Sequence, residues 1–428
     1  MSIWYDFDYT DSDDMFDAHS YSKGGLILHA LRNYVGDDAF FKSLEYYLKS
    51  HAFGKAEIHQ LRLAFEHITG EDLNWFFNQW FMDAGHPILK AEESYDDNSK
   101  KAILKVRQAQ DLEKYPVYNL NLTVDVWQGS TREQFVITID RPYQEFEFDA
   151  PTMPDLFLMD SEHILVGQIE QSKSPEQLTL QYTGYPDNMR ARLESLRLLQ
   201  EQPLDELVIS TLGKALSDSF WVIRQEAVDF FESDTTGLIS AQAKKLQDLA
   251  ISDPKSAVRT SAYAALIAHA EDSYCNVYRQ GLSDSSYSVA GYSLYGYLHC
   301  DVDDKEAVID QFIRERNFNI TSTLADYFIS EKVQGRTSWF IDRIGRYRDY
   351  EQWYFIKFFG MYLSFSAEED QIAGIEPLSD LARNHPKFFI RLAAYQSLQL
   401  IEDAPGVAEL LQQIKAVEKD PRVLQNIE

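Results

Sequence analysis

Histidine and cysteine are the residues of this sequence whose spacing is most easily tested for chemistry. None of the ten histidines is followed by glutamate, and no two are separated by three residues, so the His-Glu-x-x-His zinc motif is absent. The two cysteines, Cys275 and Cys300, stand too far apart for a Cys-x-x-Cys zinc knuckle. Neither a glycine-rich phosphate loop nor a Gly-x-Ser-x-Gly elbow occurs. Spacing alone therefore assigns no cofactor site and no nucleophile.

Tyrosine is common, with 25 copies, and most are expected to be packing residues with a solvated hydroxyl. One of them opens an ordered series of residues at helical spacing: Tyr21, Lys23, Gly24, Leu28, Leu31, Gly36 and Asp37. A second series follows and ends in a glycine and a proline: Gly70, Leu73, Trp75, Phe76, Phe77, Trp80, Gly85 and Pro87.

In this order, the two series resemble signatures of the aminopeptidase N family of gluzincins, which are zinc metallo-aminopeptidases. The resemblance covers about residues 14–88. One departure is Gly25, where the family usually has alanine. The resemblance implies that this chain is the C-terminal portion of a zinc-dependent aminopeptidase, an enzyme that removes N-terminal residues from peptides.

The same resemblance gives one residue a catalytic role. The signature tyrosine of the family faces the zinc, and its phenol donates a hydrogen bond to the oxygen that becomes negative when water attacks the peptide carbonyl. Tyr21 occupies this position, so we expect it to be catalytic. We interpret Lys23 as structural, and we expect the small residues Gly24 and Gly25 to let the helix start approach its neighbours closely.

The family's other active-site residues have no counterpart here. Its zinc ligands, its general-base glutamate and its Gly-x-Met-x-Asn loop all precede the tyrosine, and none is found in this sequence. We therefore expect the metal ligands to lie upstream of Met1. This chain is then expected to hold no zinc or other cofactor and to be inactive alone, whereas the full-length parent would bind zinc and act on peptide substrates.

Residues 1–86 are predicted to be the C-terminal helical half of the catalytic domain. Apolar residues recur there at intervals of three and four, the spacing of helices with one apolar face. Ser20 is a candidate cap for the first helix, and Asp37 with Asp38 for the second. Gly70 is expected to end the third helix, and a fourth starts near Asp72.

Residues 87–170 change to alternating apolar and polar residues, as in Leu120 to Val126. Such alternation indicates strands with one buried face, and turn-forming residues separate the alternating runs. Short strands at this spacing predict a small antiparallel β-sandwich. The polar stretch from Glu170 to Pro175 is predicted to be a linker or domain edge.

Residues 171–428 return to helical spacing and contain an internal repeat. The ten-residue segments that begin at Asp218, Asp253 and His385 align, with an arginine at the seventh position and an alanine at the tenth. A weaker copy without the arginine begins at Asp284. Because this pattern resembles HEAT repeats, we expect a HEAT/armadillo-like α-α superhelix. A plain helical bundle is the alternative. The predicted fold class is thus multidomain α+β.

The composition argues against several classes of binding partner. The formal net charge of −28 opposes binding to nucleic acid and to anionic membrane surfaces. No apolar run is long enough for a transmembrane helix, so no membrane insertion is expected. One disulfide between Cys275 and Cys300 is feasible, but two thiols leave the compartment undecided.

Two further expectations concern assembly. Helices 20–85 would expose Leu, Phe and Trp faces without the rest of a catalytic domain. We expect this surface to be covered by another copy through self-association, to be covered by part of the same chain, or to be disordered. The alternative function is a non-catalytic HEAT-repeat scaffold related to this peptidase family, since some relatives keep the architecture and lose the metal site. A His-Glu-x-x-His motif upstream of Met1 would separate the enzyme from the scaffold.

Overall fold

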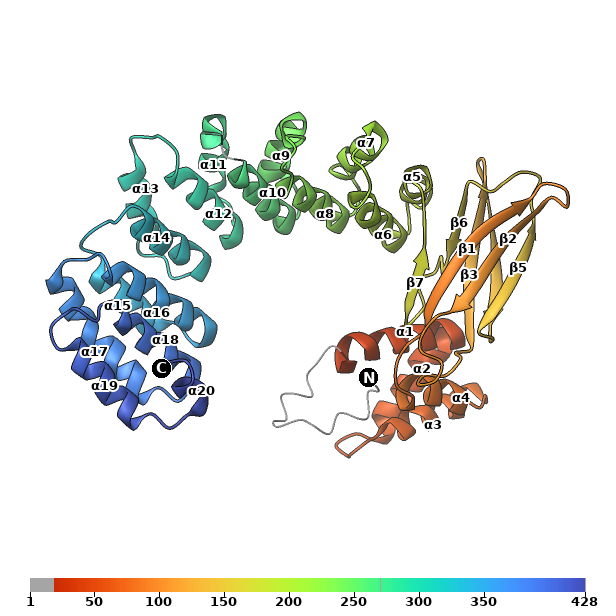
Figure 1. The fold of residues 1–428 in the computed structure, drawn as a ribbon, viewed down its shortest axis with the longest axis horizontal. Coiled ribbons are helices and arrows are strands. Elements are labelled where there is room, and N and C mark those ends of the chain that lie inside the picture. Colours follow the sequence, from red (N-terminus) through yellow and green to blue (C-terminus); the bar gives the residue numbers. More distant parts are fainter. Residues whose placement is uncertain (1–18, 270, 428) are drawn as a thin grey trace. The chain divides into compact units, whose positions relative to one another are not determined.

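The computed structural model describes residues 19–269 and 271–427, and the chain divides after Leu212 into two compact units (Figure 1). Helices predominate in both units and all strands described lie in the first, so the chain is a mixed α+β protein. The helices of the first unit are η2 (His19–Lys23), α1 (Gly24–Val35), α2 (Asp37–Ser50), α3 (Ile58–Thr69), α4 (Asn74–Phe77), η3 (Asn78–Met82), α5 (Pro175–Gly184), α6 (Met189–Gln200) and α7 (Glu206–Ala215), which ends just beyond the division.

Most ends of the N-terminal helices coincide with glycines or with a capping box. Gly36 has φ 80° and separates α1 from α2. A capping box of Glu57 and Gln60 starts α3, and Gly70 ends it in the left-handed conformation, as predicted. The predicted caps at the first two helices are wrong. Ser20 lies inside the π-helical turn η2, and Gly36 takes the cap position of α2, with Asp37 in its first turn.

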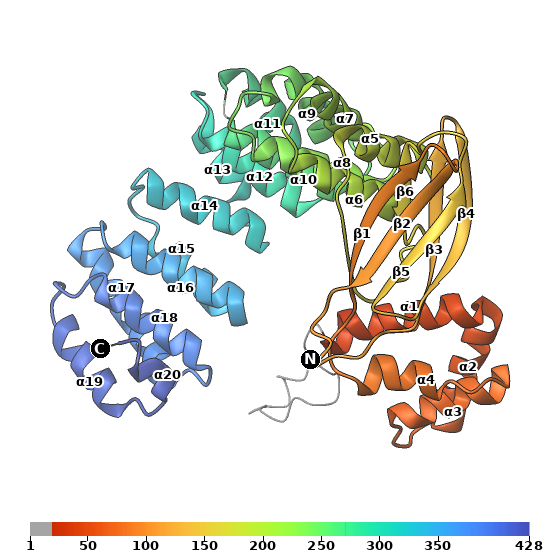
Figure 2. The same ribbon diagram turned by 45° about the vertical axis from the view of Figure 1, so that its right-hand side comes forward.

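The strands of the first unit form two sheets that share one hydrophobic core (Figure 2). They are β1 (Ile88–Asp96), β2 (Lys101–Gln108), β3 (Leu120–Gln128), β4 (Thr131–Ile139), β5 (Tyr143–Asp149), β6 (Leu156–Met159) and β7 (Gln168–Gln171). The order is β5-β2-β1-β7 in one sheet and β4-β3-β6 in the other. All pairs are antiparallel except β1 with β7, which is parallel and departs from the antiparallel prediction.

The polar stretch predicted as a linker is more ordered than expected. Strand β7 ends at Gln171, and Ser174 then caps α5 through a capping box with Gln177. Helices therefore resume at Pro175, directly after the stretch predicted as a linker.

The second unit is entirely helical among its described residues. Its elements are α8 (Trp221–Glu232), α9 (Ile239–Ser252), α10 (Ser256–Ala268), η4 (Asp272–Tyr274), α11 (Cys275–Gly281), α12 (Tyr287–Leu298), α13 (Lys305–Phe312), α14 (Phe318–Ser330), α15 (Thr337–Arg346), α16 (Asp349–Leu363), α17 (Glu368–Asn384), α18 (Phe388–Gln399), α19 (Val407–Val417) and α20 (Pro421–Leu424). Helix α8 packs on α10, and contacts continue in turn to α12, α14, α16 and α18. A disulfide joins Cys275 to Cys300.

Arginines of the repeated segments link successive helical pairs. Arg224 forms a bidentate ion pair with Asp253 at 2.6 and 2.8 Å, and its third nitrogen donates to the carbonyl of Asp218 at 2.8 Å. Arg259 repeats this arrangement with Asp284 and the carbonyl of Asp253. The segments that start at Asp253 and Asp284 thus each receive an arginine from the segment before. No described helix, in either unit, is long and apolar enough to span a membrane.

Candidate functional site around Tyr21

Tyr21 lies in the middle of the π-helical turn η2, which runs directly into α1. Short π-helical turns are uncommon and occur often at functional sites. The side chain is 64% exposed, so its phenol is accessible to a ligand. The structure therefore places the predicted catalytic tyrosine on the surface, at the start of the helix that carries the signature.

Lys23 connects this turn to the second signature segment. Its Nζ donates a hydrogen bond of 3.0 Å to the carbonyl oxygen of Gly85, 62 residues along the chain. Burial lowers the pKa of Lys23, and burial together with the nearby Lys23 charge lowers the pKa of His86. The Tyr21 segment and the Gly85-His86-Pro87 segment, separate in sequence, are thus one local structure.

Gly85 has a backbone conformation and a surrounding that suit glycine alone. Its φ is +91°, and a Cβ at this position would lie 2.5 Å from Cδ1 of Tyr115. At Gly25, by contrast, a Cβ would meet no described heavy atom within 4 Å. The expectation that Gly25 permits a close helix approach is therefore not met within the described part of the chain. A close approach occurs at Gly85 instead, where the backbone lies against the ring of Tyr115.

The aromatic residues of the second signature segment fill the core beneath α1. Phe76, Phe77 and Trp80 are each less than 5% exposed, and the Trp80 ring stacks on Tyr118 with 5.5 Å between ring centroids. Gln79 exchanges two hydrogen bonds with the backbone of Asn119. These contacts fix the N-terminal helices against the sheets of the same unit, with these aromatics as core residues.

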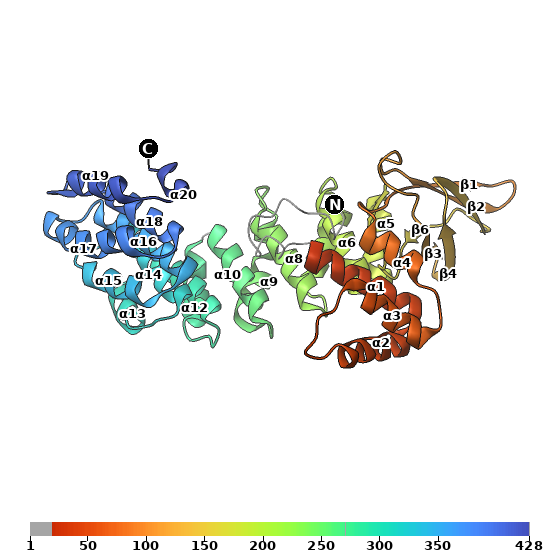
Figure 3. The ribbon, with the colours of Figure 1, turned by 90° about the horizontal axis from the view of Figure 1, so that it is seen from below.

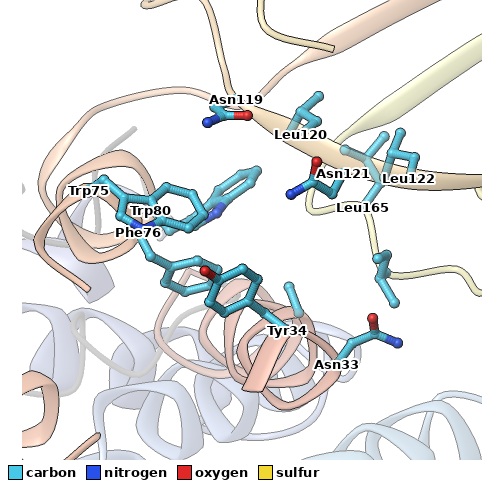
Figure 4. Close-up of a pocket in the computed structure, with 12 residues that line it drawn as sticks. Asn33, Tyr34, Trp75, Phe76, Trp80, Asn119, Leu120, Asn121, Leu122 and Leu165 are labelled. Atoms are coloured by element: carbon cyan, nitrogen blue, oxygen red, sulfur yellow. The ribbon is translucent and has the colours of Figure 1, made fainter. Parts of the chain in front are cut away.

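A cavity of about 90 Å³ lies where α1, α4 and η3 meet the start of β3 (Figure 4). Tyr34 and Trp75 form one wall, with their rings at 5.5 Å and nearly perpendicular, and Asn119 and Asn121 lie across from them. The volume suits a few water molecules at about 30 Å³ each. Because Tyr21 is not among its lining residues, this cavity is a feature of the packing and not the predicted active site.

The described residues do not fit a zinc ion. No group of three or more His, Cys, Asp or Glu side chains comes together as a metal site within residues 19–269 and 271–427. The adjacent residues Glu66 and His67 have different partners. Glu66 accepts from Arg62 and from the backbone of Leu73, whereas the ring of His67 stacks on Tyr46.

Sequence reasoning missed the contacts that hold Tyr21 in place. The residue types indicate a structural role for Lys23 but do not identify the group that it contacts, and Gly85 is only a position of the signature. Lys23 and Gly85 both belong to the ordered signature. This indicates that they share one local structure, but it does not predict a hydrogen bond between them.

The segment that contains Tyr21 is similar to known proteins. Residues 7–80 match the peptidase family M1 domain. Aminopeptidase N of Streptomyces lividans is 36% identical over 104 residues, which are 24% of this chain and 12% of that protein. Aminopeptidase M1 of Arabidopsis thaliana is 38% identical over 80 residues, 19% of this chain and 9% of that protein. Tricorn protease-interacting factor F2 of Thermoplasma volcanium is 40% identical over 79 residues, 18% of this chain and 10% of that protein.

The matched segment thus spans about a tenth of the length of these curated relatives, 9–12% in the three cases. Over 98% of this chain, the fold resembles the crystal structure of Legionella pneumophila aminopeptidase A in complex with aspartic acid, with a TM-score of 0.60 and 12% identity. This likeness covers 57% of that chain and concerns the fold alone. Residues 7–80 are thus similar to peptidase family M1, and the aminopeptidase relatives agree with the resemblance to the aminopeptidase N family of gluzincins.

Proposed function

We propose that this chain is part of a zinc-dependent aminopeptidase that removes N-terminal residues from peptides, and that Tyr21 is its oxyanion-stabilising residue. The observation that carries the proposal is the position of Tyr21 within the matched M1 segment, exposed on a turn that Lys23 ties to Gly85. The names of the relatives, aminopeptidases in the main, support the reaction class.

The chemistry proposed for Tyr21 is electrostatic. When water attacks a peptide carbonyl, the carbonyl oxygen becomes negative, and a phenol O–H aimed at it donates a hydrogen bond that strengthens in the transition state. A phenol suits this task because it is a donor at neutral pH. The exposure of Tyr21 leaves its hydroxyl accessible, and the bond from Lys23 to Gly85 limits the movement of the turn that carries it.

The zinc of this reaction is proposed to be held by residues outside this sequence. The 428 residues contain no His-Glu-x-x-His motif, and the described residues offer no metal site. The chain alone is therefore expected neither to bind catalytic zinc nor to cleave peptides. Metal analysis and an aminoacyl-anilide assay on residues 1–428 test this: turnover with stoichiometric zinc would overturn the assignment of the ligands.

The role of Tyr21 is tested by Tyr21→Phe in a longer form of the protein that carries a zinc motif. We expect kcat to fall by about 10²–10³-fold, with KM little changed, because the lost hydrogen bond forms mainly in the transition state. Tyr34→Phe is the matched control, since Tyr34 lies on α1, is 43% exposed and donates to Glu71. Steady-state kinetics that give Tyr21→Phe the turnover of this control would remove Tyr21 from the mechanism.

For the rest of the chain, we propose a β-sandwich at 87–170 and a HEAT-like superhelix at 171–428, following a catalytic-domain remnant at 1–86. The support for the superhelix is the series of arginine–carboxylate pairs between repeated segments, from Arg224 to Asp253 and from Arg259 to Asp284. Arg391, in the third aligned segment, pairs with Glu418 in the same way. Equivalent arginines with equivalent partners are expected of a true repeat and not of an irregular bundle.

The scaffold function remains the second candidate, favoured by the lack of a zinc motif in the sequence. The gene sequence upstream of Met1 separates the two. A His-Glu-x-x-His motif followed about one helix later by glutamate supports the enzyme. An upstream sequence without the motif supports the scaffold.

A further inference from the structure

The second unit contains a cavity of about 510 Å³ that five helices line in succession. Helices α8, α10, α12, α14 and α16 each contribute to it, and each packs on the next (Figure 1). Neighbouring helix axes lie about 8–10 Å apart, so the path from α8 to α16 is roughly 30–40 Å long. An extended polypeptide rises about 3.3 Å per residue, so about ten residues cover this path.

Carboxylates on two of these helices line the cavity without a salt bridge among the described residues, although the charge of His269 acts to lower the pKa of one of them, Glu232. Glu232, at the end of α8, and Asp326, on α14, are half-buried lining residues, and no ion pair engages either one among the described residues. Burial, together with the charge of Asp229, raises the pKa of Glu232. A half-buried carboxylate without a counter-ion favours a cation beside it.

Aromatic rings also line the cavity. Tyr292 and Tyr295 come from α12 and Phe358 from α16, and Tyr292 is 45% exposed. Aromatic faces attract ammonium and guanidinium groups. Gly291 lets α14 approach α12 closely, since a Cβ there would lie 2.9 Å from the carbonyl oxygen of Asn319. Asn319 and Ser322 add amide and hydroxyl groups, which suit the polar groups of a peptide backbone.

We propose that this cavity binds an extended polypeptide segment that carries Lys or Arg side chains. The length favours a polypeptide, the two carboxylates and the rings favour cationic side chains, and the net charge of −28 opposes anionic ligands. This site lies within the second unit and goes beyond the proposed peptidase function. Binding to it needs neither zinc nor turnover.

The test uses the full 428-residue chain and fluorescence anisotropy. The probe is a labelled decapeptide of alternating lysine and glycine, with a glutamate–glycine decapeptide as the acidic counterpart. The variant Glu232→Gln/Asp326→Asn removes both cavity charges. The matched control, Asp310→Asn/Glu331→Gln, removes two exposed charges that do not line the cavity. Circular dichroism and thermal unfolding check that both variants fold.

We expect the lysine peptide to bind and the glutamate peptide not to bind. The cavity double variant should weaken binding at least tenfold, while the control stays within about twofold, as expected for exposed charges away from a site. Equal losses in the two double variants would show general charge attraction and overturn the proposal. Displacement of the peptide by spermidine at equal concentration would also overturn it, because a small polyamine would then suffice.

A second pair of variants tests the aromatic wall without changing charge. Tyr292→Ala should weaken binding several-fold because it removes a ring from the cavity. Tyr287→Ala, at the start of the same helix and 51% exposed, should leave binding unchanged. An unchanged affinity in Tyr292→Ala would contradict the proposed placement of the peptide.

Discussion

Single side chains decide how the loops of the first unit are held. Asp160, directly after β6, has φ 55° and a carboxylate that accepts hydrogen bonds from the backbone N–H groups of Ile164 and Leu165 at 2.9 and 3.0 Å. These two residues line the cavity between α1 and β3. The carboxylate is almost fully buried, and burial raises the pKa of Asp160 to about 6 in spite of the two hydrogen bonds.

This raised pKa predicts a pH-dependent stability. Between about pH 4 and pH 6 the folded protein keeps a proton on Asp160 that the unfolded chain has lost, so stability falls as pH rises through this window. The shift corresponds to roughly 3 kcal/mol, at about 1.4 kcal/mol for each pKa unit. Asp160→Asn keeps an acceptor oxygen and removes the titration. Urea unfolding at several pH values should therefore show a shallower slope in this variant, and parallel slopes would exclude Asp160 as the cause.

In the second unit, ion pairs link one helical element to the next. Arg224 reaches from α8 to Asp253, which begins the next repeated segment and also accepts a hydrogen bond from the backbone N–H of Lys255. Both partners of the ion pair are at least nine-tenths buried. A buried charge without a partner destabilises the fold. Removing either member of this ion pair alone should therefore lower the free energy of unfolding.

Two arginines with similar pairing but different burial test this point. Arg224→Met should lower the free energy of unfolding by about 3–5 kcal/mol, because it leaves the buried carboxylate of Asp253 without its counter-ion. Arg346→Met also breaks a bidentate pair, with Asp342, but both of those side chains are about 40% exposed. Its effect should stay below about 1 kcal/mol. Urea unfolding measures both, and equal losses would contradict the importance of burial.

The sequence predicted elements whose signals are local. The third helix, with its apolar spacing and its terminal glycine at Gly70, is where the pattern indicated. The pairing of β1 with β7 departs from the antiparallel prediction for a physical reason. Strand β7 is short and polar, and its parallel pairing with β1 depends on residues about 80 positions away. The π-helical turn at Tyr21 also has no local signal, because intrinsic propensities do not distinguish it from an ordinary helix start.

The candidate site divides in the same way. The resemblance predicted a role for Tyr21, which stays a prediction, and the match to the M1 domain over residues 7–80 agrees with the family resemblance alone. The bond from Lys23 to Gly85 and the clash that keeps residue 85 a glycine are long-range contacts, so residue types and spacing did not reveal them. The carboxylates and rings of the α8–α16 cavity were missed because they come together only when five helices stack.

At the scale of the whole molecule, two surface properties oppose each other. The net charge of −28 disfavours contact between copies. Apolar side chains on α2 and α3, which lie side by side (Figure 3), favour it: Phe41, Leu48 and Leu63 are each more than half exposed. Which property dominates depends on ionic strength, because salt screens the charge and leaves the apolar contact intact.

We therefore expect the chain to self-associate through α2 and α3, more strongly as NaCl rises from about 0.05 to 0.5 M, as repulsion is screened. Sedimentation velocity at several salt concentrations measures this. Phe41→Glu with Leu48→Glu should restore the monomer, whereas Val136→Glu, at a 73% exposed position on β4, should not. A chain that stays monomeric at every salt concentration would contradict the expectation.

The hydrogen bond from Lys23 to Gly85 also has a consequence for protein engineering. If the Tyr21 turn is transplanted into another scaffold and the graft stops at the end of α1, the acceptor of the Lys23 hydrogen bond, Gly85, is left behind. The portable unit is the turn together with the Gly85-His86-Pro87 loop and the Tyr115 ring against which that loop packs. We expect grafts that carry both pieces to hold the turn more firmly than grafts that carry one.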